Sequence, residues 1–241
     1  MTYCVGLLID AGIVCLSDTR TNAGLDNIAV YRKMFVFEEP GERAIVIMTA
    51  GSLSVTQTTL ARIEEAATDM EPSQETSIML APTILQVAQI IGRTLADVTH
   101  EIRARVGQSQ VDTGASFIVA GQRAGGDMRM FLIYPEGNFI EATEDTPFLQ
   151  IGEHKYGKPI LDRVISRDTS LVDAKKAALL SMASTLRSNL SVGMPLDMAV
   201  IGRDAMRVTE RRRIEDQDPT FLRMSADWSD ALRRAFAGIE I

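Results

Sequence analysis

The second residue of the chain, Thr2, brings together a hydroxyl group and, once Met1 is removed, a free α-amine. Removal of Met1 is permitted by the small residue that follows it. The reference pKa of an α-amine is about 7.7–8.0, so near neutral pH a useful fraction of this amine is unprotonated and can accept the hydroxyl proton. This is the threonine and N-terminal amine version of an activated nucleophile, and it needs no histidine.

Thr2 also suits the start of a β-strand because its side chain is β-branched, so the residues downstream decide between the two interpretations. Asp18 and Arg20 close the second predicted strand, Lys33 precedes a third, and Ala50-Gly51-Ser52 ends an apolar run. Each alone could be ordinary: a polar hairpin edge, a charge that protects an edge strand, or a turn glycine. Their order and spacing from Thr2 together indicate a catalytic constellation.

In this order and spacing, the chain resembles the proteasome-type peptidases, a branch of the N-terminal nucleophile hydrolases. The family pattern is an N-terminal Thr, a hairpin ending in Asp-x-Arg, a Lys, and an apolar strand ending in Ala-Gly-Ser, and the resemblance covers nearly the whole chain. The absence of a propeptide before Thr2 and the long stretch after Ile201 are similar to the bacterial Anbu branch. The resemblance implies one domain over residues 1–241, of which about 204–241 form a C-terminal extension with a terminal helix.

The resemblance also implies a role for each residue of the constellation. Thr2 Oγ would attack a peptide carbonyl, with its own amine as general base through a water. Lys33 would lower the proton affinity of the amine and the nucleophile, and Asp18 would hold the Lys33 ammonium in place. The backbone N–H of Gly51 would stabilise the oxyanion.

Two later segments depart from the family pattern. Glu153 stands where the family has a serine beside the nucleophile, and a carboxylate close to the amine would raise the pKa of that amine. Ser191 matches the serine of a later Asp-x-x-Ser motif, but Ser188 or Asn189 stands where the aspartate belongs, so the partner of Ser191 stays open. Both departures are compatible with weak activity or an unusual choice of substrate.

For the substrate, the resemblance implies an extended peptide that adds main-chain hydrogen bonds at a sheet edge, between Arg20-Thr21-Asn22 and Gly51. The residues that match the family's side-chain pocket, which would suit an apolar residue, are Thr21, Tyr31, Phe35, Thr49 and Leu53. The family assembles into rings, so we expect a homo-oligomeric ring or spiral. Neither ring closure nor an ATPase partner can be deduced from the residues.

Charge and composition narrow the class of partner. The chain has 241 residues, 46% of them hydrophobic, and a formal net charge of −7. An acidic balance argues against nucleic acid, which requires a basic footprint. The densest basic run, 211–213, is flanked by Glu210, Glu215 and Asp216, and we interpret it as a solvated or interface face.

The sequence predicts a cytoplasmic protein without a cofactor or metal. Cys4 and Cys15 both fall in the first hairpin at positions that do not oppose each other, so no disulfide is expected, in agreement with a reducing compartment. No secretory signal is present, and the longest uncharged stretch, 77–92, is too short and polar to span a membrane. With only His100 and His154, a zinc site would have to depend on carboxylates.

Hydrophobic periodicity gives groups of strands separated by pairs of helices. The predicted strands are Thr2–Ile9, Gly12–Asp18, Met34–Glu38, Ala44–Thr49, Ser116–Ala120, Arg129–Tyr134, Asn138–Glu141, Asp197–Ile201 and Met206–Glu210. The predicted helices are Ser52–Met70, Leu80–Val106, Tyr156–Ile165, Val172–Ser188 and Ala226–Phe236. This order, without strict βαβ alternation, predicts an α+β fold: two stacked, mainly antiparallel sheets with helices outside, the four-layer αββα sandwich that the family resemblance also implies.

Two other functions remain open from the sequence. A non-catalytic scaffold subunit of the same fold is disfavoured because such subunits carry an N-terminal extension, whereas this chain begins at the nucleophile. A small-molecule amidase of the wider N-terminal nucleophile class would share the mechanism but needs a closed pocket in place of an open groove.

Overall fold

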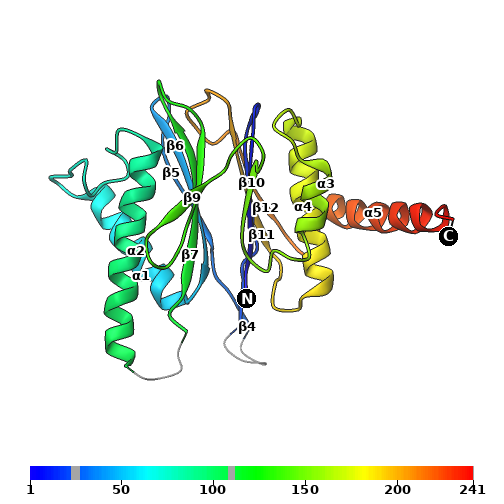
Figure 1. Ribbon diagram of the computed structural model, residues 1–241, viewed down its shortest axis with the longest axis horizontal. Coiled ribbons are helices and arrows are strands. Elements are labelled where there is room, and N and C mark those ends of the chain that lie inside the picture. The colour runs from blue at the N-terminus through cyan, green and yellow to red at the C-terminus, as the bar shows by residue number, and fades with distance from the viewer. Residues whose placement is uncertain (23–27, 108–111, 241) are drawn as a thin grey trace.

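The computed structural model describes residues 1–22, 28–107 and 112–240. Two β-sheets lie face to face, and helices cover their outer faces (Figure 1). Among the described residues each large sheet has five strands, in the orders β10-β1-β2-β11-β12 and β5-β6-β7-β8-β9. The strand pairs are antiparallel. The predicted four-layer αββα sandwich is therefore confirmed.

The strands of the first large sheet are β1 (Tyr3–Ile9), β2 (Gly12–Ser17), β10 (Phe148–Gly152), β11 (Leu196–Gly202) and β12 (Glu210–Ile214). Those of the second are β5 (Met34–Glu39), β6 (Arg43–Gly51), β7 (Ala115–Arg123), β8 (Arg129–Ile133) and β9 (Phe139–Glu141). A small hairpin is made by β3 (Arg20–Asn22) and β4 (Ile28–Val30). The helices are α1 (Leu53–Thr68), α2 (Ile84–Val106), α3 (Lys158–Val164), α4 (Leu171–Ser188) and α5 (Pro219–Ala237).

Three apolar cores separate the four layers. Successive side chains of a strand point to opposite faces, so Val5 of β1 packs toward α4 while Cys4 enters the core between the sheets. On β6, Met48 lies in that same inter-sheet core, whereas Ile47 packs on the other face under α1 and α2. Because both faces of β1 and β6 are covered, these strands are apolar almost throughout.

Helix boundaries follow from local signals. Thr83 caps α2 by accepting a hydrogen bond from the N–H of Gln86, and Gly107, with φ of 59°, ends the helix. The helix α5 extends away from the sandwich (Figure 1), and Phe221 is its buried residue. Within the part of the chain that the structure describes, no helix combines the length and apolar character needed to cross a membrane.

Several predicted elements were wrong in position. The last strand is Glu210–Ile214, not Met206–Glu210, and Met206 has φ of +47°, which a strand does not allow. The terminal helix begins at Pro219, well before Ala226. The strand β10 and the β3–β4 hairpin were not predicted. The first hairpin pairs Cys4 with Ser17 and Cys15 with Gly6, so the two cysteines do not face each other and are free thiols.

Candidate active site

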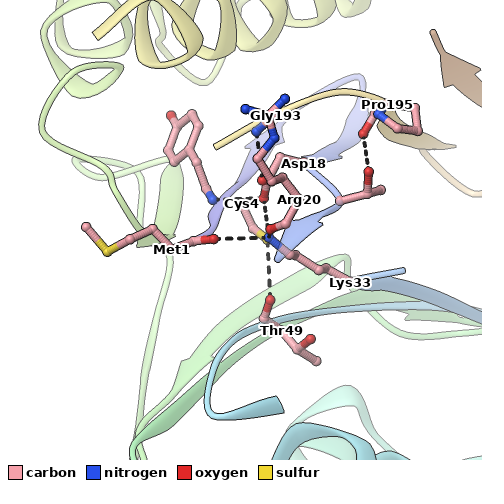
Figure 2. Close-up of polar contacts among 10 residues, drawn as sticks. Met1, Cys4, Asp18, Arg20, Lys33, Thr49, Gly193 and Pro195 are labelled. Atoms are coloured by element: carbon pink, nitrogen blue, oxygen red, sulfur yellow. Dashed lines mark hydrogen bonds and ion pairs between the residues drawn. The ribbon is translucent and has the colours of Figure 1, made fainter. Parts of the chain in front are cut away.

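The candidate site lies where four strands of both large sheets begin or end. Thr2 directly precedes β1 and Asp18 directly follows β2, while Lys33 directly precedes β5 and Gly51 ends β6. Pairing of Met34 with Met48 places Lys33 opposite Thr49, whose N–H donates to the Lys33 carbonyl at 2.9 Å. The fold therefore brings the sequence-predicted Asp18 and Lys33 together next to the start of β1 (Figure 2).

Lys33 is the centre of the polar contacts. Its Nζ donates to Asp18 Oδ1 at 2.8 Å, to the Arg20 carbonyl at 2.6 Å and to the Met1 carbonyl at 3.4 Å (Figure 2). The side chains of Lys33 and Asp18 are 7% and 0% exposed. An ammonium group is thus held out of water, directly beside the peptide bond that joins Met1 to Thr2.

Asp18 is fixed from two further directions. Its Oδ1 accepts the Tyr3 N–H at 3.0 Å and its Oδ2 accepts the Gly193 N–H at 3.2 Å. Burial raises the pKa of Asp18 above its ordinary value, although Lys33 and the two N–H groups act in the opposite direction. The Asp18 carboxylate therefore ties the first residues of β1, Lys33 and the loop around Gly193 into one unit.

The α-amine at the start of the chain lies in the field of the same charges. Burial is the largest effect and Lys33 the next, and both lower the pKa of the Met1 amine; Asp18 and Glu153 act to raise it. Thr2, one residue further on, is 8% exposed. An amine at Thr2 would stand one residue from the Met1 amine, among these same charged groups.

The segment that carries Glu153 closes over Thr2. The N–H of Glu153 donates to the Thr2 carbonyl at 2.7 Å. Gly152 has φ of +80°, and a Cβ at this position would lie 1.9 Å from the Thr2 carbonyl oxygen, so only glycine fits. The Glu153 side chain is 12% exposed, and among the described residues its cationic neighbour is the exposed Lys155, at 3.8 Å. The Oε2 of Glu153 is buried and makes no hydrogen bond to the described residues.

Gly51 occupies a backbone position that other residues cannot take. Its φ is +106°, and a Cβ would lie 2.3 Å from the carbonyl oxygen of Gly114 on the neighbouring strand segment. The chain turns here from β6 into α1, which begins at Leu53. The requirement for glycine is therefore steric and would hold with or without a role in catalysis.

We expect Gly51→Ala to reduce the free energy of unfolding more than a matched change elsewhere. Gly125→Ala is the control, because Gly125 also has positive φ, +73°, but a Cβ at this position would meet nothing within 4 Å. The control should cost about 1–2 kcal/mol from the left-handed backbone alone. Urea denaturation of both variants measures the difference. Equal losses of unfolding free energy in the two variants would show that the structure accommodates a Cβ at residue 51 near Gly114 without an added energetic cost.

The loop that follows α4 holds the predicted Ser191. Its N–H donates to Asn189 Oδ1 at 2.9 Å, and Arg20 Nη1 donates to the Leu190 carbonyl at 2.9 Å. No hydrogen bond among the described residues links Ser191 to Thr2. Gly193, which the sequence analysis missed, packs under the Arg20 guanidinium, because a Cβ there would lie 2.1 Å from Arg20 Nε.

The residues predicted to bind substrate lie in different environments. Thr21 is half-buried on β3, and Tyr31 is 40% exposed. Phe35 packs against the core under α1 and α2, Thr49 is 4% exposed, and Leu53 is half-buried at the start of α1. Asn22 pairs with Ile28 through the backbone of β3 and β4; its side chain lies outside the described part of the chain.

A second buried network, also missed from the sequence, anchors β1 behind Thr2. The Tyr3 hydroxyl lies 2.5 Å from Ser181 Oγ on α4 and accepts from Gln150 Nε2 at 2.6 Å. Burial raises the pKa of Tyr3 to about 12, so the hydroxyl keeps its proton. Through these two hydrogen bonds, Tyr3 links β1, the strand that directly follows Thr2, both to α4 and to β10.

In the described ranges, no group of three or more His, Cys, Asp or Glu residues is placed to hold a metal ion.

Comparison with known proteins gives one consistent result. The family model described as "Proteasome subunit" matches residues 2–201. Among solved structures, the Anbu (Gly-1) mutant from Hyphomicrobium sp. strain MC1 is 46% identical, with a TM-score of 0.93 and coverage of 100% of this chain and 99% of that one. Among curated proteins, none matches the chain.

Two further structures agree. Anbu (ancestral beta-subunit) from Yersinia bercovieri is 40% identical with a TM-score of 0.91, and the match covers 99% of this chain and 97% of the Yersinia chain. The structure named "Helical Assembly of the Anbu Complex from Pseudomonas aeruginosa" is 41% identical with a TM-score of 0.89, and the match covers 99% of this chain and 97% of the Pseudomonas chain. The chain therefore belongs to the proteasome subunit family, in its Anbu branch.

Proposed function

We propose that the chain is a threonine-type endopeptidase subunit that hydrolyses peptide bonds through Thr2 after Met1 has been removed. The observation that carries the proposal is the position of Lys33, which is ion-paired with buried Asp18 and donates to the carbonyl of Met1, directly before Thr2. A buried ammonium beside a hydroxyl and an amine favours the deprotonated form of both. Membership of the proteasome subunit family supports the same reaction.

In the proposed reaction, Thr2 Oγ bonds to the substrate carbonyl carbon while its proton passes through a water to the Thr2 amine. The C–N bond of the substrate then breaks, the leaving nitrogen takes up a proton, and an ester on Thr2 remains. A second water adds to the ester, releases the carboxylic acid product and restores the hydroxyl group. The Gly51 N–H is proposed to donate to the oxygen that becomes negative, a contribution worth about 2.7–4 kcal/mol in other enzymes.

Glu153 provides a test through the pH dependence of the reaction. Its carboxylate acts to raise the pKa of the Met1 amine. We expect it to act in the same direction on the Thr2 amine, which is freed one residue away and must be unprotonated to act as base. Removing that charge in Glu153→Gln lowers the pKa of the amine. We therefore expect the rise of activity with pH to move to lower pH in this variant, measured as the rate of labelling by a threonine-directed electrophile.

The matched control for this experiment is Glu144→Gln, which removes the same charge at an exposed position. Its pH profile should coincide with that of the parent protein. If Glu153→Gln leaves the profile unmoved, or shifts it to higher pH, Glu153 does not act on the amine.

The proposal also covers how the chain assembles with other copies and the cellular compartment in which it acts. A relative from Pseudomonas aeruginosa forms a helical assembly by its description, and we propose that this chain also forms a homo-oligomeric ring or spiral. The last turn of α5 and the residues after it support this, because Phe236 and Ile239 are 80% and 70% exposed and a partner subunit would cover them. We further propose that it acts in the cytoplasm, since Cys4 and Cys15 are free thiols.

The decisive experiment is mass spectrometry of the purified particle before and after treatment with a threonine-directed electrophile. We expect loss of Met1 and one adduct per chain, located at Thr2 by peptide mapping. Retention of Met1 in the assembled particle would block the general base and would favour a scaffold role. Hydrolysis of small amides but not of fluorogenic peptides would favour an amidase.

A further inference from the structure

The Tyr3 hydroxyl group lies directly behind the candidate site, where β1, β10 and α4 meet. The Tyr3 side chain is fully buried in the core between the first sheet and α4. Tyr3 pairs with Gly152, so Gln150 stands diagonally across from it on the same face of the sheet, within reach of a long side chain. Gln150 Nε2 donates to the Tyr3 hydroxyl at 2.6 Å. Because the hydroxyl accepts this hydrogen bond, its own proton is free for Ser181 Oγ, 2.5 Å away.

The residues that follow Gln150 along the chain form a compact turn, which we define as residues 152–158 and call the Glu153 turn. Three internal backbone hydrogen bonds of 2.9 to 3.2 Å hold it together, and two of them end on the carbonyl of His154. Because the turn is tied internally in this way, a displacement of one end is passed on to the other.

Both ends of the Glu153 turn contact the first residues of the chain. At its start, the Glu153 N–H donates to the Thr2 carbonyl at 2.7 Å. Near its end, Gly157 packs so closely that a Cβ at this position would lie 2.6 Å from the Tyr3 hydroxyl oxygen and 2.2 Å from Ser181 Oγ. The hydroxyl therefore supports one end of the turn, while the other end rests on the main chain of Thr2.

The hydroxyl is not needed to keep β1 in its sheet. Five residues of β1 pair with β10 and six pair with β2. The Tyr3 N–H is held separately, by Asp18 Oδ1 at 3.0 Å. The aromatic ring would still fill the core without its oxygen. Loss of the hydroxyl is therefore a local change, and the part of the molecule that it affects most directly is the Glu153 turn.

We propose that the Tyr3 hydroxyl is a positioning group for the candidate site: it fixes the Glu153 turn, and through the turn it fixes Glu153 and Thr2 relative to each other. Tyr3 itself touches no reacting group in this proposal. The inference rests on the proposed peptidase function for its effect on reactivity, because a small misplacement of a catalytic group can reduce a rate by about 10²-fold. The contact between Tyr3 and the turn does not depend on whether Thr2 reacts.

Hydrogen exchange followed by mass spectrometry tests this contact in the full-length protein. Tyr3→Phe keeps the ring but removes the group that lies between Gln150 and Gly157. We expect the amide hydrogens of residues 152–158 to exchange roughly tenfold faster than in the parent protein, in line with the loss of one hydrogen bond. Gln150→Met removes the donor to the same hydroxyl and should have the same effect. Exchange in β2 should stay at the parent rate, because the sheet remains intact.

Thr185→Val is the matched control, because it also removes a fully buried hydroxyl group from the neighbourhood of Ser181. The Thr185 hydroxyl donates to the Ser181 carbonyl at 3.0 Å, within α4. This variant should leave the exchange of the Glu153 turn unchanged. The rate of labelling at Thr2 by a threonine-directed electrophile is then measured on the same proteins. It should fall at least about tenfold in Tyr3→Phe and Gln150→Met and stay at the parent value in Thr185→Val.

Exchange of residues 152–158 at the parent rate in Tyr3→Phe would overturn the inference. Equal acceleration in Thr185→Val would also overturn it, since this would indicate a general loss of stability. Faster exchange in Tyr3→Phe with labelling at the parent rate would show that the turn does not position Thr2. If the parent protein itself is not labelled, faster exchange in Tyr3→Phe and Gln150→Met alone would support the positioning contact and contradict only the peptidase proposal.

Discussion

Thr2→Ala is expected to lose covalent labelling by a threonine-directed electrophile completely, and peptide hydrolysis by at least about 10³-fold. The variant keeps the small second residue that permits removal of Met1, and therefore keeps the free amine, but it has no hydroxyl to form the ester. Loss of a nucleophile has cost as much as about 10⁶-fold in another hydrolase. Intact-mass spectrometry detects the adduct, and a fluorogenic peptide measures the rate.

Thr2→Ser is the matched control, because it keeps the hydroxyl and the amine and loses only a methyl group. It should still be labelled at residue 2. Size-exclusion chromatography should show the same particle for both variants, since Thr2 lies before β1 and outside its ladder. Labelling of Thr2→Ala equal to that of the parent would place the reactive group elsewhere in the chain.

Lys33→Met should have two separable effects, on stability and on activity. The ammonium of Lys33 is the ion-pair partner of Asp18, whose side chain is 0% exposed. Removing one partner of a buried pair leaves an uncompensated charge and costs about 3–5 kcal/mol. Labelling at Thr2 should also be lost, because the amine and hydroxyl lose the charge that favours their deprotonation.

The double variant Lys33→Met/Asp18→Asn distinguishes the two effects. Asparagine removes the unpaired charge, so urea denaturation should show recovery of much of the lost stability, whereas labelling should stay absent. The loss in Lys33→Met alone should shrink as the pH falls: removal of Lys33 raises the pKa of Asp18 further, and the folded variant then gains a proton that neutralises the carboxylate.

Lys175→Met provides the control for the stability measurement. Lys175 is paired with Glu210 at 2.7 Å, but both side chains are partly exposed, at 29% and 39%. An exposed pair of this kind contributes at most about 1 kcal/mol. If Lys33→Met/Asp18→Asn were labelled at the rate of the parent protein, the role of Lys33 would be structural only.

The layers of the fold could be predicted because local patterns encode them. The continuous apolar run of β6 is typical of a strand that is buried on both faces. The repeat of Ala88, Ile91, Leu95 and Val98 is typical of a helix with one buried stripe, and all four are buried. The proximity of Asp18 and Lys33 followed from their positions at strand ends within a known family pattern.

What could not be predicted depends on tertiary context. The strand β12 reads Glu-Arg-Arg-Arg-Ile, a composition that strands disfavour, and it is a strand because β11 pairs with it at the edge of the sheet. The Asp18 contact with Gly193 spans 175 residues, and no local pattern indicates it. For α5, a signal was present and was missed, since Asp218 caps the helix and Pro219 opens it.

The candidate site is divided between the two sheets: Thr2 and Asp18 come from one, Lys33 and Gly51 from the other. Its geometry therefore depends on the packing that keeps the sheets in register, including the side chains of Met34, Met48 and Met130. Oxidation of such thioethers to polar sulfoxides disrupts a core, and a displacement of about 1 Å can cost a catalytic site about 10²-fold in rate. Oxidation of the methionines between the two sheets would thus reduce the activity of the site while every residue of the site itself stayed chemically unchanged.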